Sequence, residues 1–330
     1  MPANLTPDYL AAEARFRVAE TTEEKLAALE EMYATIPKHK GTEKLQADIK
    51  RRISKLREKE KQASKKGRRF DEFYIVRQGA GQIALVGPPN SGKSTILGRL
   101  TAAQPEVADY PFTTRRPTPG MMEYQDVSVQ LIDPPPVAAG YTERGVIGLV
   151  RNADAAAVVL DASDNALLER IEEVREELAG SKTILVGGDA AEVERTPGTM
   201  EKPALIVANK MDLPGAAENQ DVLRDLYGGE FSIQPVSALT GLGLEELRQA
   251  LFDVLGIIRV YTKVPGKPPD REKPFTLKKG STLIEFAGAV HKDFAYSLRF
   301  ARAWGRNMLD GAQVGRDHVL EDGDVVELHA

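Results

Sequence analysis

The chain has 330 residues, 42% of them hydrophobic and 28% charged, which is enough for two or three domains with full-sized cores. It contains no cysteine, which excludes disulfides, thiolate metal sites and thiol catalysis. The first residues show no basic stretch followed by an apolar core, and no apolar run approaches the roughly 20 residues of a membrane span, so we expect a cytoplasmic protein without a signal peptide or membrane segment.

Residues 1–80 are predicted to form a basic helical region without strands. From residue 37 to residue 69 the chain carries 14 Lys or Arg against 4 Asp or Glu, although the net charge of the whole protein is −5. Apolar residues recur there at helical spacing, so one face can pack while the rest is basic. These residues are Leu45, Ile49, Ile53 and Leu56. The charge fits a polyanionic partner, nucleic acid or the ribosome, and it equally fits a solvated helix crossed by salt bridges.

Residues 81–256 alternate short apolar runs with helical stretches. The predicted strands are 82–87, 127–133, 155–163, 204–210 and 231–238, and the predicted helices include 94–104, 165–180 and 244–255. Strands that are apolar throughout and separated by helices indicate a mainly parallel sheet covered on both faces. The predicted fold class is therefore α/β.

Residues 257–330 have a different pattern. A segment rich in Pro and Lys is followed by a helical stretch, and "FARAWGRNM" and "GDVVELHA" read as strands. This order predicts a small α+β module at the end of the chain. Its single tryptophan, Trp304, is predicted to lie in the core rather than to stack on a nucleic-acid base.

The stretch "GPPNSGKS", Gly87 to Ser94, fits the phosphate-loop pattern G-x-x-x-x-G-K-[ST] and lies between a predicted strand and a predicted helix. Glycines let backbone N–H groups close around phosphates, and the N-terminus of the helix adds its dipole. Lys93 would bridge the β- and γ-phosphates, and Ser94 would bind Mg²⁺. The motif predicts a nucleoside triphosphate without saying which one.

The stretch "NKMD", Asn209 to Asp212, indicates the base. Asp212 can accept hydrogen bonds from N1–H and from the 2-amino group of guanine, whereas adenine offers no such pair. Two charge-assisted hydrogen bonds of roughly 1.5–3 kcal/mol each would give about two to four decades of preference. The stretch "SAL", Ser237 to Leu239, follows the next predicted strand and is placed to back the base with a main-chain N–H. An ATP-using kinase is disfavoured by this order of motifs.

Two further stretches lie between these motifs. Tyr110–Gly120 contains Thr113 and Thr114, and Thr114 is the preferred second Mg²⁺ ligand. Asp133 ends the apolar run 127–133 and would hold a Mg²⁺-bound water, as strand-end acids do in phosphate-loop enzymes. The alternative for Asp133 is a helix or turn cap.

With these residues in view, the chain resembles the DRG-type (developmentally regulated GTP-binding) GTPases of the Obg superfamily, which end in a TGS domain. The resembling stretches are "IPKHKGTEKLQADI", "YPFTT", "IRVYTKVPGKPPD", "HKDF", "ARAWG" and "DGDVVELH". The resemblance implies GTP binding, slow GTP hydrolysis and a ribosome-linked role. DRG proteins usually carry a small inserted domain before the NKxD motif, and here that insert looks shortened or absent.

The family pattern D-x-P-G is also altered. Asp133 is followed by three prolines, so Pro135 matches the family proline while Pro136 replaces the glycine whose N–H meets the γ-phosphate. Because proline has no N–H, we expect Asp133 to keep its role near Mg²⁺ while sensing of the γ-phosphate is weakened. The alternative function is a guanine-nucleotide-binding scaffold with negligible turnover.

Position 137 carries Val137, where many GTPases have a glutamine that orients the attacking water. In related GTPases with an apolar residue there, an asparagine of the phosphate loop can help bind K⁺, and Asn90 occupies that place. We therefore hypothesise slow hydrolysis that rises with K⁺. The alternative is that Asn90 only braces the loop.

The residues expected at the nucleotide site are Gly87, Pro88, Pro89, Asn90, Ser91, Gly92, Lys93, Ser94, Thr95, Phe112, Thr113, Thr114, Asp133, Asn209, Lys210, Asp212, Ser237, Ala238 and Leu239. Of these, Lys93, Thr114 and Asp133 are expected to serve catalysis, and Ser94 and Thr114 to bind Mg²⁺.

The expected partners are GTP or GDP, with the ribosome or RNA reached through the basic helix and the TGS-like module. In that module 12 basic residues face 10 acidic ones from Arg259 to Ala330, so a protein partner fits as well as RNA. The candidate RNA contacts there are Lys278, Lys279, Lys292, Arg299, Arg302 and Arg306.

Overall fold

A computed structural model describes residues 6–19, 22–37, 42–43, 45–56, 73–103, 116–138, 140, 142–187, 198–306 and 308–329 of the chain. Contacts between Cα atoms divide the protein into two compact units, Met1–Glu72 and Phe73–Ala330. The domain boundaries predicted after residues 80 and 256 stay predictions. Among the helices that the structure describes, none has both the length and the apolar character needed to cross a membrane.

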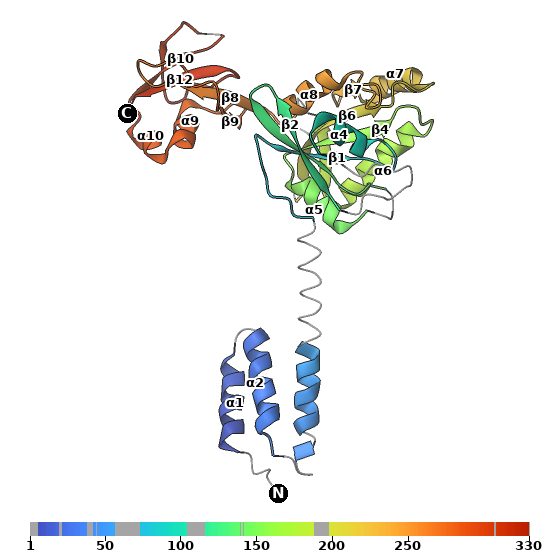
Figure 1. Cartoon of the computed structure of the whole chain (residues 1–330), viewed down its shortest axis with the longest axis vertical. Coiled ribbons are helices and arrows are strands. Elements are labelled where there is room, and N and C mark those ends of the chain that lie inside the picture. Colours follow the sequence, from blue (N-terminus) through green and yellow to red (C-terminus); the bar gives the residue numbers. More distant parts are fainter. Residues whose placement is uncertain are drawn as a thin grey trace. The chain divides into compact units, whose positions relative to one another are not determined.

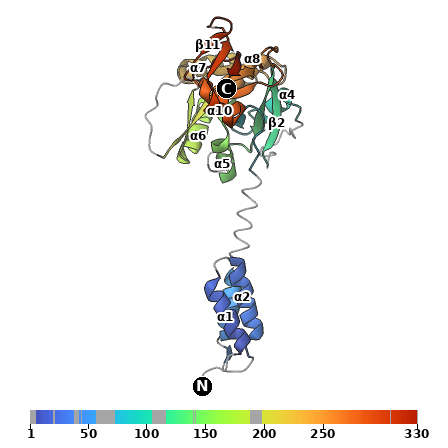
Figure 2. The same cartoon turned by 90° about the vertical axis from the view of Figure 1, so that its left-hand side faces the viewer.

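The N-terminal unit is helical in its described residues. Helices α1 (Pro7–Val18) and α2 (Thr22–Thr35) lie side by side with a third helix over residues 45–56, all blue in Figures 1 and 2. Ile49 is buried among them, and Leu45, Ile53 and Leu56 pack against the same cluster. The apolar face predicted for the basic helix is therefore confirmed.

The larger sheet of the second unit is mainly parallel, as predicted. Its strands follow the order β2-β3-β1-β4-β6-β5, with β7 also paired to β6, and every pair is parallel except β2 with β3. The strands are β1 (Gln82–Val86), β2 (Thr118–Tyr124), β3 (Val127–Asp133), β4 (Ala155–Asp161), β5 (Thr183–Gly187), β6 (Met200–Asn209) and β7 (Ile233–Pro235).

Helices cover both faces of this sheet (Figure 1). One apolar core joins the sheet to α5 (Arg144–Asn152), α6 (Leu167–Gly180) and α7 (Ala216–Tyr227). The other joins it to α4 (Lys93–Leu100) and α8 (Leu244–Asp253). Because the central strands run parallel, the loops after their carboxyl ends meet at one edge, which is where ligands bind in such sheets.

Two strands of this sheet were not predicted. β2 begins Thr-Pro-Gly, a sequence that argues against a strand, but it lies at the sheet edge, where a missing N–H is tolerated. β5 lies at the opposite end of the strand order and pairs only with β6. β2 has one neighbour and no continuous apolar run, so the pattern that identified the other strands could not find it, whereas β5 reads Thr-Ile-Leu-Val-Gly, which fits that pattern but was not assigned.

The C-terminal segment forms a second, five-stranded sheet in the order β11-β10-β12-β8-β9, packed against α9 and α10, which matches the predicted α+β module. The ammonium of Lys263 lies 4.6 Å from the ring centroid of Trp304, which is only partly buried, so the prediction of a core tryptophan was too simple. The elements are β8 (Ile257–Thr262), β9 (Phe275–Lys278), α9 (Leu283–Val290), α10 (Lys292–Ser297), β10 (Phe300–Trp304), β11 (Ala312–Val314) and β12 (Asp324–His329).

Arg259 of β8 connects the two sheets of this unit. Its guanidinium lies 2.8 Å from Asp126, in the turn between β2 and β3, and 2.6 Å from Asp322. The same guanidinium lies over the ring of Phe252 at 5.3 Å, and Tyr261 donates to Asp126. The turn of the β2–β3 hairpin is therefore held by the C-terminal sheet.

Candidate functional site

The predicted phosphate loop follows the fully buried strand β1 and leads into α4. Gly87 has φ +156°, and a Cβ there would come within 2.2 Å of the carbonyl oxygen of Val159. Gly92 has φ +95°, and a Cβ there would come within 2.1 Å of the side-chain amide of Asn209. Both positions require glycine, because the loop packs directly against β4 and against Asn209, the last residue of β6.

Lys93 is folded back into this loop. Its ammonium donates to the carbonyl oxygens of Gly87 (3.0 Å) and Pro88 (2.8 Å). The whole Lys93 residue is only 7% exposed. Burial lowers the pKa of Lys93 to about 8, and the charge of Asp133 opposes that shift in part. A polyphosphate would offer this ammonium anionic acceptors in place of neutral carbonyls, which is a stronger interaction.

Asp133 lies beside Ser94 at the end of β3. The Ser94 hydroxyl donates to Oδ2 of Asp133 at 2.5 Å, while the buried Oδ1 has no hydrogen-bond partner within the described residues. Burial raises the pKa of Asp133, and the hydrogen bond from Ser94 and the charge of Lys93 lower it in part. This contact favours a role in the site over a helix cap.

A magnesium ion fits the residues present. Mg²⁺ takes oxygen ligands and keeps several waters, which can donate to a carboxylate. The unpartnered Oδ1 belongs to the Asp133 carboxylate whose Oδ2 accepts from the hydroxyl of Ser94, and the buried hydroxyl of Ser91, in the same loop, also lacks a partner among the described residues. Buried polar atoms without partners are rare in folded proteins, so these two indicate a place for polar ligand groups.

The three prolines after Asp133 are buried, and so is Val137. The backbone N–H of Val137 donates to the carbonyl oxygen of Gly87 at 3.0 Å. The side chain of Val137 belongs to the apolar core that contains Val146 and Leu149. In this conformation both the N–H and the side chain of residue 137 are committed to the protein, so neither can orient a water molecule.

Asn209 is the first residue of the predicted base loop, Asn209–Asp212, and it connects the phosphate loop with the Ser237–Leu239 stretch. Its side-chain amide donates to the carbonyl oxygen of Ser91 at 2.8 Å, and its Oδ1 accepts from the N–H of Ala238 at 3.1 Å. Ser237, which is fully buried, donates to Oδ1 of Asp212 at 2.5 Å. The carboxylate of Asp212 is thus oriented by its neighbour in the fold before any base is bound.

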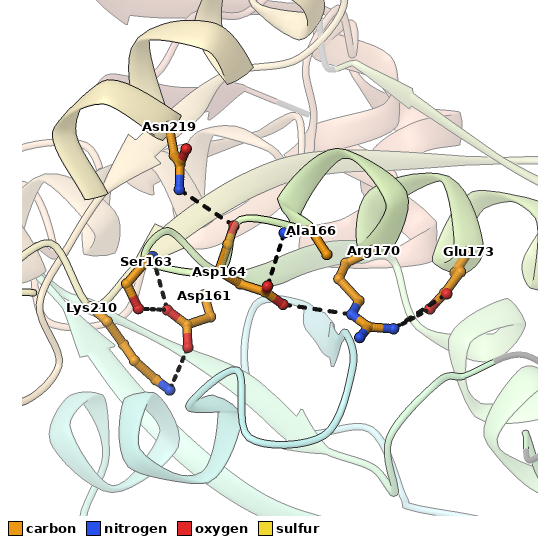
Figure 3. Close-up of polar contacts among 8 residues, drawn as sticks. All are labelled: Asp161, Ser163, Asp164, Ala166, Arg170, Glu173, Lys210 and Asn219. Atoms are coloured by element: carbon orange, nitrogen blue, oxygen red, sulfur yellow. Dashed lines mark hydrogen bonds and ion pairs between the residues drawn. The ribbon is translucent and has the colours of Figure 1, made fainter. Parts of the chain in front are cut away.

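Lys210 pairs with Asp161, a residue that no motif indicated (Figure 3). Asp161 ends β4, and in the parallel pairing of β4 with β6 it lies opposite Asn209. An acid at the carboxyl end of a buried parallel strand was the available signal, because the ends of neighbouring strands meet at one edge.

The remaining predicted residues have mixed outcomes. Phe112, Thr113 and Thr114 lie outside the described residues, so the proposed second Mg²⁺ ligand is without a described position. Asn90 is exposed and has φ +61°, and the side chain of Leu239 is also exposed. The structure therefore brings together the phosphate loop, Asp133 and the two loops after β6 and β7.

A parallel sheet that carries a phosphate loop after β1 and an Asn-Lys-x-Asp loop after β6 defines the class of P-loop GTP-binding proteins. A family model described as 50S ribosome-binding GTPase matches residues 82–210, and one described as TGS domain matches residues 258–330. A GTP-binding protein of Halobacterium salinarum is 30% identical, covering 93% of this chain and 99% of its own length.

Two eukaryotic relatives are similar over a comparable length. Developmentally-regulated G-protein 1 of Arabidopsis thaliana is 29% identical, over 92% of this chain and 90% of its own. Ribosome-interacting GTPase 1 of Saccharomyces cerevisiae is 29% identical, over 93% of this chain and 99% of its own. The chain belongs to the family of DRG-type GTP-binding proteins, which combine a GTPase domain with a TGS domain.

The relatives contain residues that this chain lacks. The alignment with the Halobacterium protein runs over 366 residues, which exceeds the 330 residues of the chain. Between β4 and β6 the described residues form only α6 and β5. Both observations agree with the short segment seen in the sequence before the NKMD stretch.

Proposed function

We propose that this GTP-binding protein hydrolyses GTP slowly to GDP and phosphate, with Mg²⁺ as cofactor. The observation that supports guanine as the base is the pair of contacts made by Asn209 and Ser237. Asn209 joins the base loop to the phosphate loop at Ser91 and to Ala238. Ser237 orients the carboxylate of Asp212. A carboxylate held in this way accepts from N1–H and from the 2-amino group of guanine without further rearrangement.

Each side chain would have a limited role. Lys93 would bind the β- and γ-phosphates and offset negative charge during transfer to water. Ser94 and Thr114 would hold Mg²⁺, and Asp133 would accept from one of its waters. The metal supplies charge neutralisation at the phosphates. Because Val137 turns its side chain into the core and its N–H to Gly87, residue 137 offers no group that orients the attacking water, which supports a slow rate.

The second candidate function is a guanine-nucleotide-binding scaffold with negligible turnover. The buried segment Pro134–Pro136 favours it, because Pro136 has no N–H to offer to a γ-phosphate. If the prolines prevent sensing of the γ-phosphate, GDP and a non-hydrolysable GTP analogue should bind with similar affinity in the presence of Mg²⁺.

Titration of both nucleotides into the wild type and two variants separates these functions. Pro136→Gly and Pro136→Ala both restore an N–H, and only the first adds glycine's freedom. If both variants gain about tenfold preference for the analogue, the worth of one charge-assisted hydrogen bond, the missing N–H disables sensing and the scaffold function is favoured. A strong preference for the analogue in the wild type would instead favour the working GTPase.

The role of K⁺ is a separate proposal. Asn90 is the exposed residue of the phosphate loop that could contribute an oxygen to the ion. Turnover of GTP should then be faster in KCl than in NaCl at the same ionic strength, and Asn90→Ala should remove the difference. Equal rates in the two salts would support the alternative that Asn90 only braces the loop.

The link to the ribosome is also proposed. It is supported by the name of the yeast relative and by the basic segment 37–69, part of which lies outside the described residues. The six candidate basic side chains of the C-terminal module are all exposed. Sedimentation with ribosomes that weakens steeply with salt would support this role, and its absence at low salt would contradict it. The cytoplasmic location stays a prediction.

A further inference from the structure

The ends of β4 and β6 lie together beside the proposed nucleotide site. Asp161, the last residue of β4, is opposite Asn209, the last residue of β6, and the N–H of Ala162 donates to the carbonyl oxygen of Asn209 at 2.8 Å. The chain after β6 continues with Lys210. The first residue of the base loop outside the sheet is therefore placed next to the end of β4.

The two carboxylate oxygens of Asp161 have different partners (Figure 3). Oδ1 accepts from the N–H of Ser163 at 3.0 Å and from its hydroxyl at 2.6 Å, while Oδ2 accepts from the Lys210 ammonium at 2.7 Å. Burial alone would raise the pKa of Asp161, but the hydrogen bonds from Lys210 and Ser163 outweigh burial. The net result is a pKa below the usual value. The carboxylate is thus an anion at neutral pH with one oxygen fixed by its own loop and the other fixing Lys210.

The loop that follows Asp161, residues 162–166, is held by contacts with two neighbouring helices. The side-chain amide of Asn219, from α7, donates to the carbonyl oxygens of Ala162 (2.9 Å) and Asp164 (3.3 Å). Asp164 accepts from the N–H of Ala166 at 2.9 Å at the start of α6, and Arg170 lies 3.6 Å from its carboxylate (Figure 3). The loop after β4 is therefore anchored to two helices.

Lys210, in contrast, has an unfavourable backbone conformation. Its φ is +65°, in the left-handed region that non-glycine residues seldom adopt, and such a conformation persists only when surrounding contacts hold it. It lies between Asn209, which contacts the phosphate loop, and Asp212, which would contact the base. Among the described residues, the ion pair with Asp161 is the polar contact given for the Lys210 side chain, with 31% of the Lys210 side chain and 24% of the Asp161 side chain exposed.

We infer that Asp161 is a positioning residue of the base-binding loop, holding Lys210 so that Asp212 faces the guanine base. This inference rests on the proposed nucleotide site and adds a determinant of its affinity. Without the pair, the loop would sample other conformations, and nucleotide affinity would fall in proportion to the population of the competent one. The phosphate end would be unchanged, so the effect belongs to binding rather than to the chemical step.

The test measures the Kd of GDP for the full-length wild type, Asp161→Asn, Lys210→Met and the double variant. We expect each single change to raise Kd about five- to tenfold, as for the loss of a partly buried ion pair that orders a loop. The double variant should be no weaker than the weaker single one, because Asp161 acts through Lys210. Turnover at saturating GTP should stay within about twofold in Asp161→Asn, since only binding is affected.

Asp164→Asn is the matched control. This carboxylate lies in the same loop and contacts Ala166 and Arg170. Its replacement should change Kd by no more than about twofold, because loop-surface pairs contribute little. Three results would overturn the inference about Asp161 while leaving the nucleotide site in place. They are an equal rise of Kd in Asp164→Asn, additive effects in the double variant, and an unchanged Kd in Asp161→Asn. A wild type that fails to bind GDP would overturn the nucleotide site as well.

Discussion

The two ends of the proposed nucleotide site differ in how their polar groups are satisfied. At the phosphate end, Asp133 and Ser91 each leave a buried oxygen without a partner among the described residues. At the base end, Asn209 and Asp212 accept from Ala238 and Ser237 in the protein alone. The base end is thus organised by the fold, whereas the phosphate end has buried polar atoms that the described protein atoms leave without a partner.

The largest effect is expected from breaking the organised end at Asp212. Asp212→Asn should lower GDP affinity about hundredfold or more, because two charge-assisted hydrogen bonds of about 1.5–3 kcal/mol each lose their anionic acceptor. The new amide can donate to the 2-oxo group of xanthine, so affinity for XDP should rise. Calorimetric titration with both nucleotides checks this, with Asp221→Asn, exposed on α7, as the control. Unchanged GDP binding would remove the assignment of the base.

A smaller effect on binding is expected at the phosphate end. Lys93→Met should lower the affinity for GDP and GTP about tenfold to hundredfold, the worth of one or two charge-assisted hydrogen bonds. The nucleotide-free variant should unfold at the same temperature as the wild type or higher, because a buried ammonium bonded to neutral carbonyls is costly to desolvate. A lower Tm would show that those two bonds stabilise the loop without a ligand, and the contrast between the two ends would be smaller than we infer.

The smallest effect concerns stability and pH at the base end. The folded-state pKa of Asp161 lies below its ordinary value of 3.8, so the unfolded state binds the proton more readily. Its contribution is present above that value and is lost as pH falls through the folded pKa. Asp161→Asn should cost up to about 1 kcal/mol at pH 7, in the range of partly exposed ion pairs, and the difference should shrink below about pH 4. A pH-independent difference would assign the effect to packing rather than to charge.

The motifs of the nucleotide site could be predicted from sequence because each is short and lies next to a buried central strand. The phosphate loop, Asp133 and the NKMD stretch follow β1, β3 and β6 as expected. Asp161 could not be recognised by a motif, since its role depends on the pairing of β4 with β6, which brings together residues 49 positions apart. The acid at the end of an apolar strand marks Asp161 as a residue near the ligand edge of the sheet, but only the tertiary contact identifies Lys210 as its partner.

The orientation of Val137 illustrates the same limit. An apolar residue after Pro136 indicates that no water-orienting side chain is present, but it does not say whether that side chain faces the nucleotide or the core. The structure packs it beside Val146 of α5, a helix that the sequence analysis did not identify. Where a helix is missed, the residues that it covers cannot be assigned to an interior.

The run of three prolines also determines how this segment can be observed in solution. Proline has no amide proton, so hydrogen–deuterium exchange and amide NMR receive no signal from residues 134 to 136. The next amide, that of Val137, is bonded to the carbonyl oxygen of Gly87 at 3.0 Å and is therefore protected while the segment lies against the phosphate loop. Its exchange rate, with and without nucleotide, gives the free energy of opening the contact between Val137, whose amide is the first after the proline run, and Gly87.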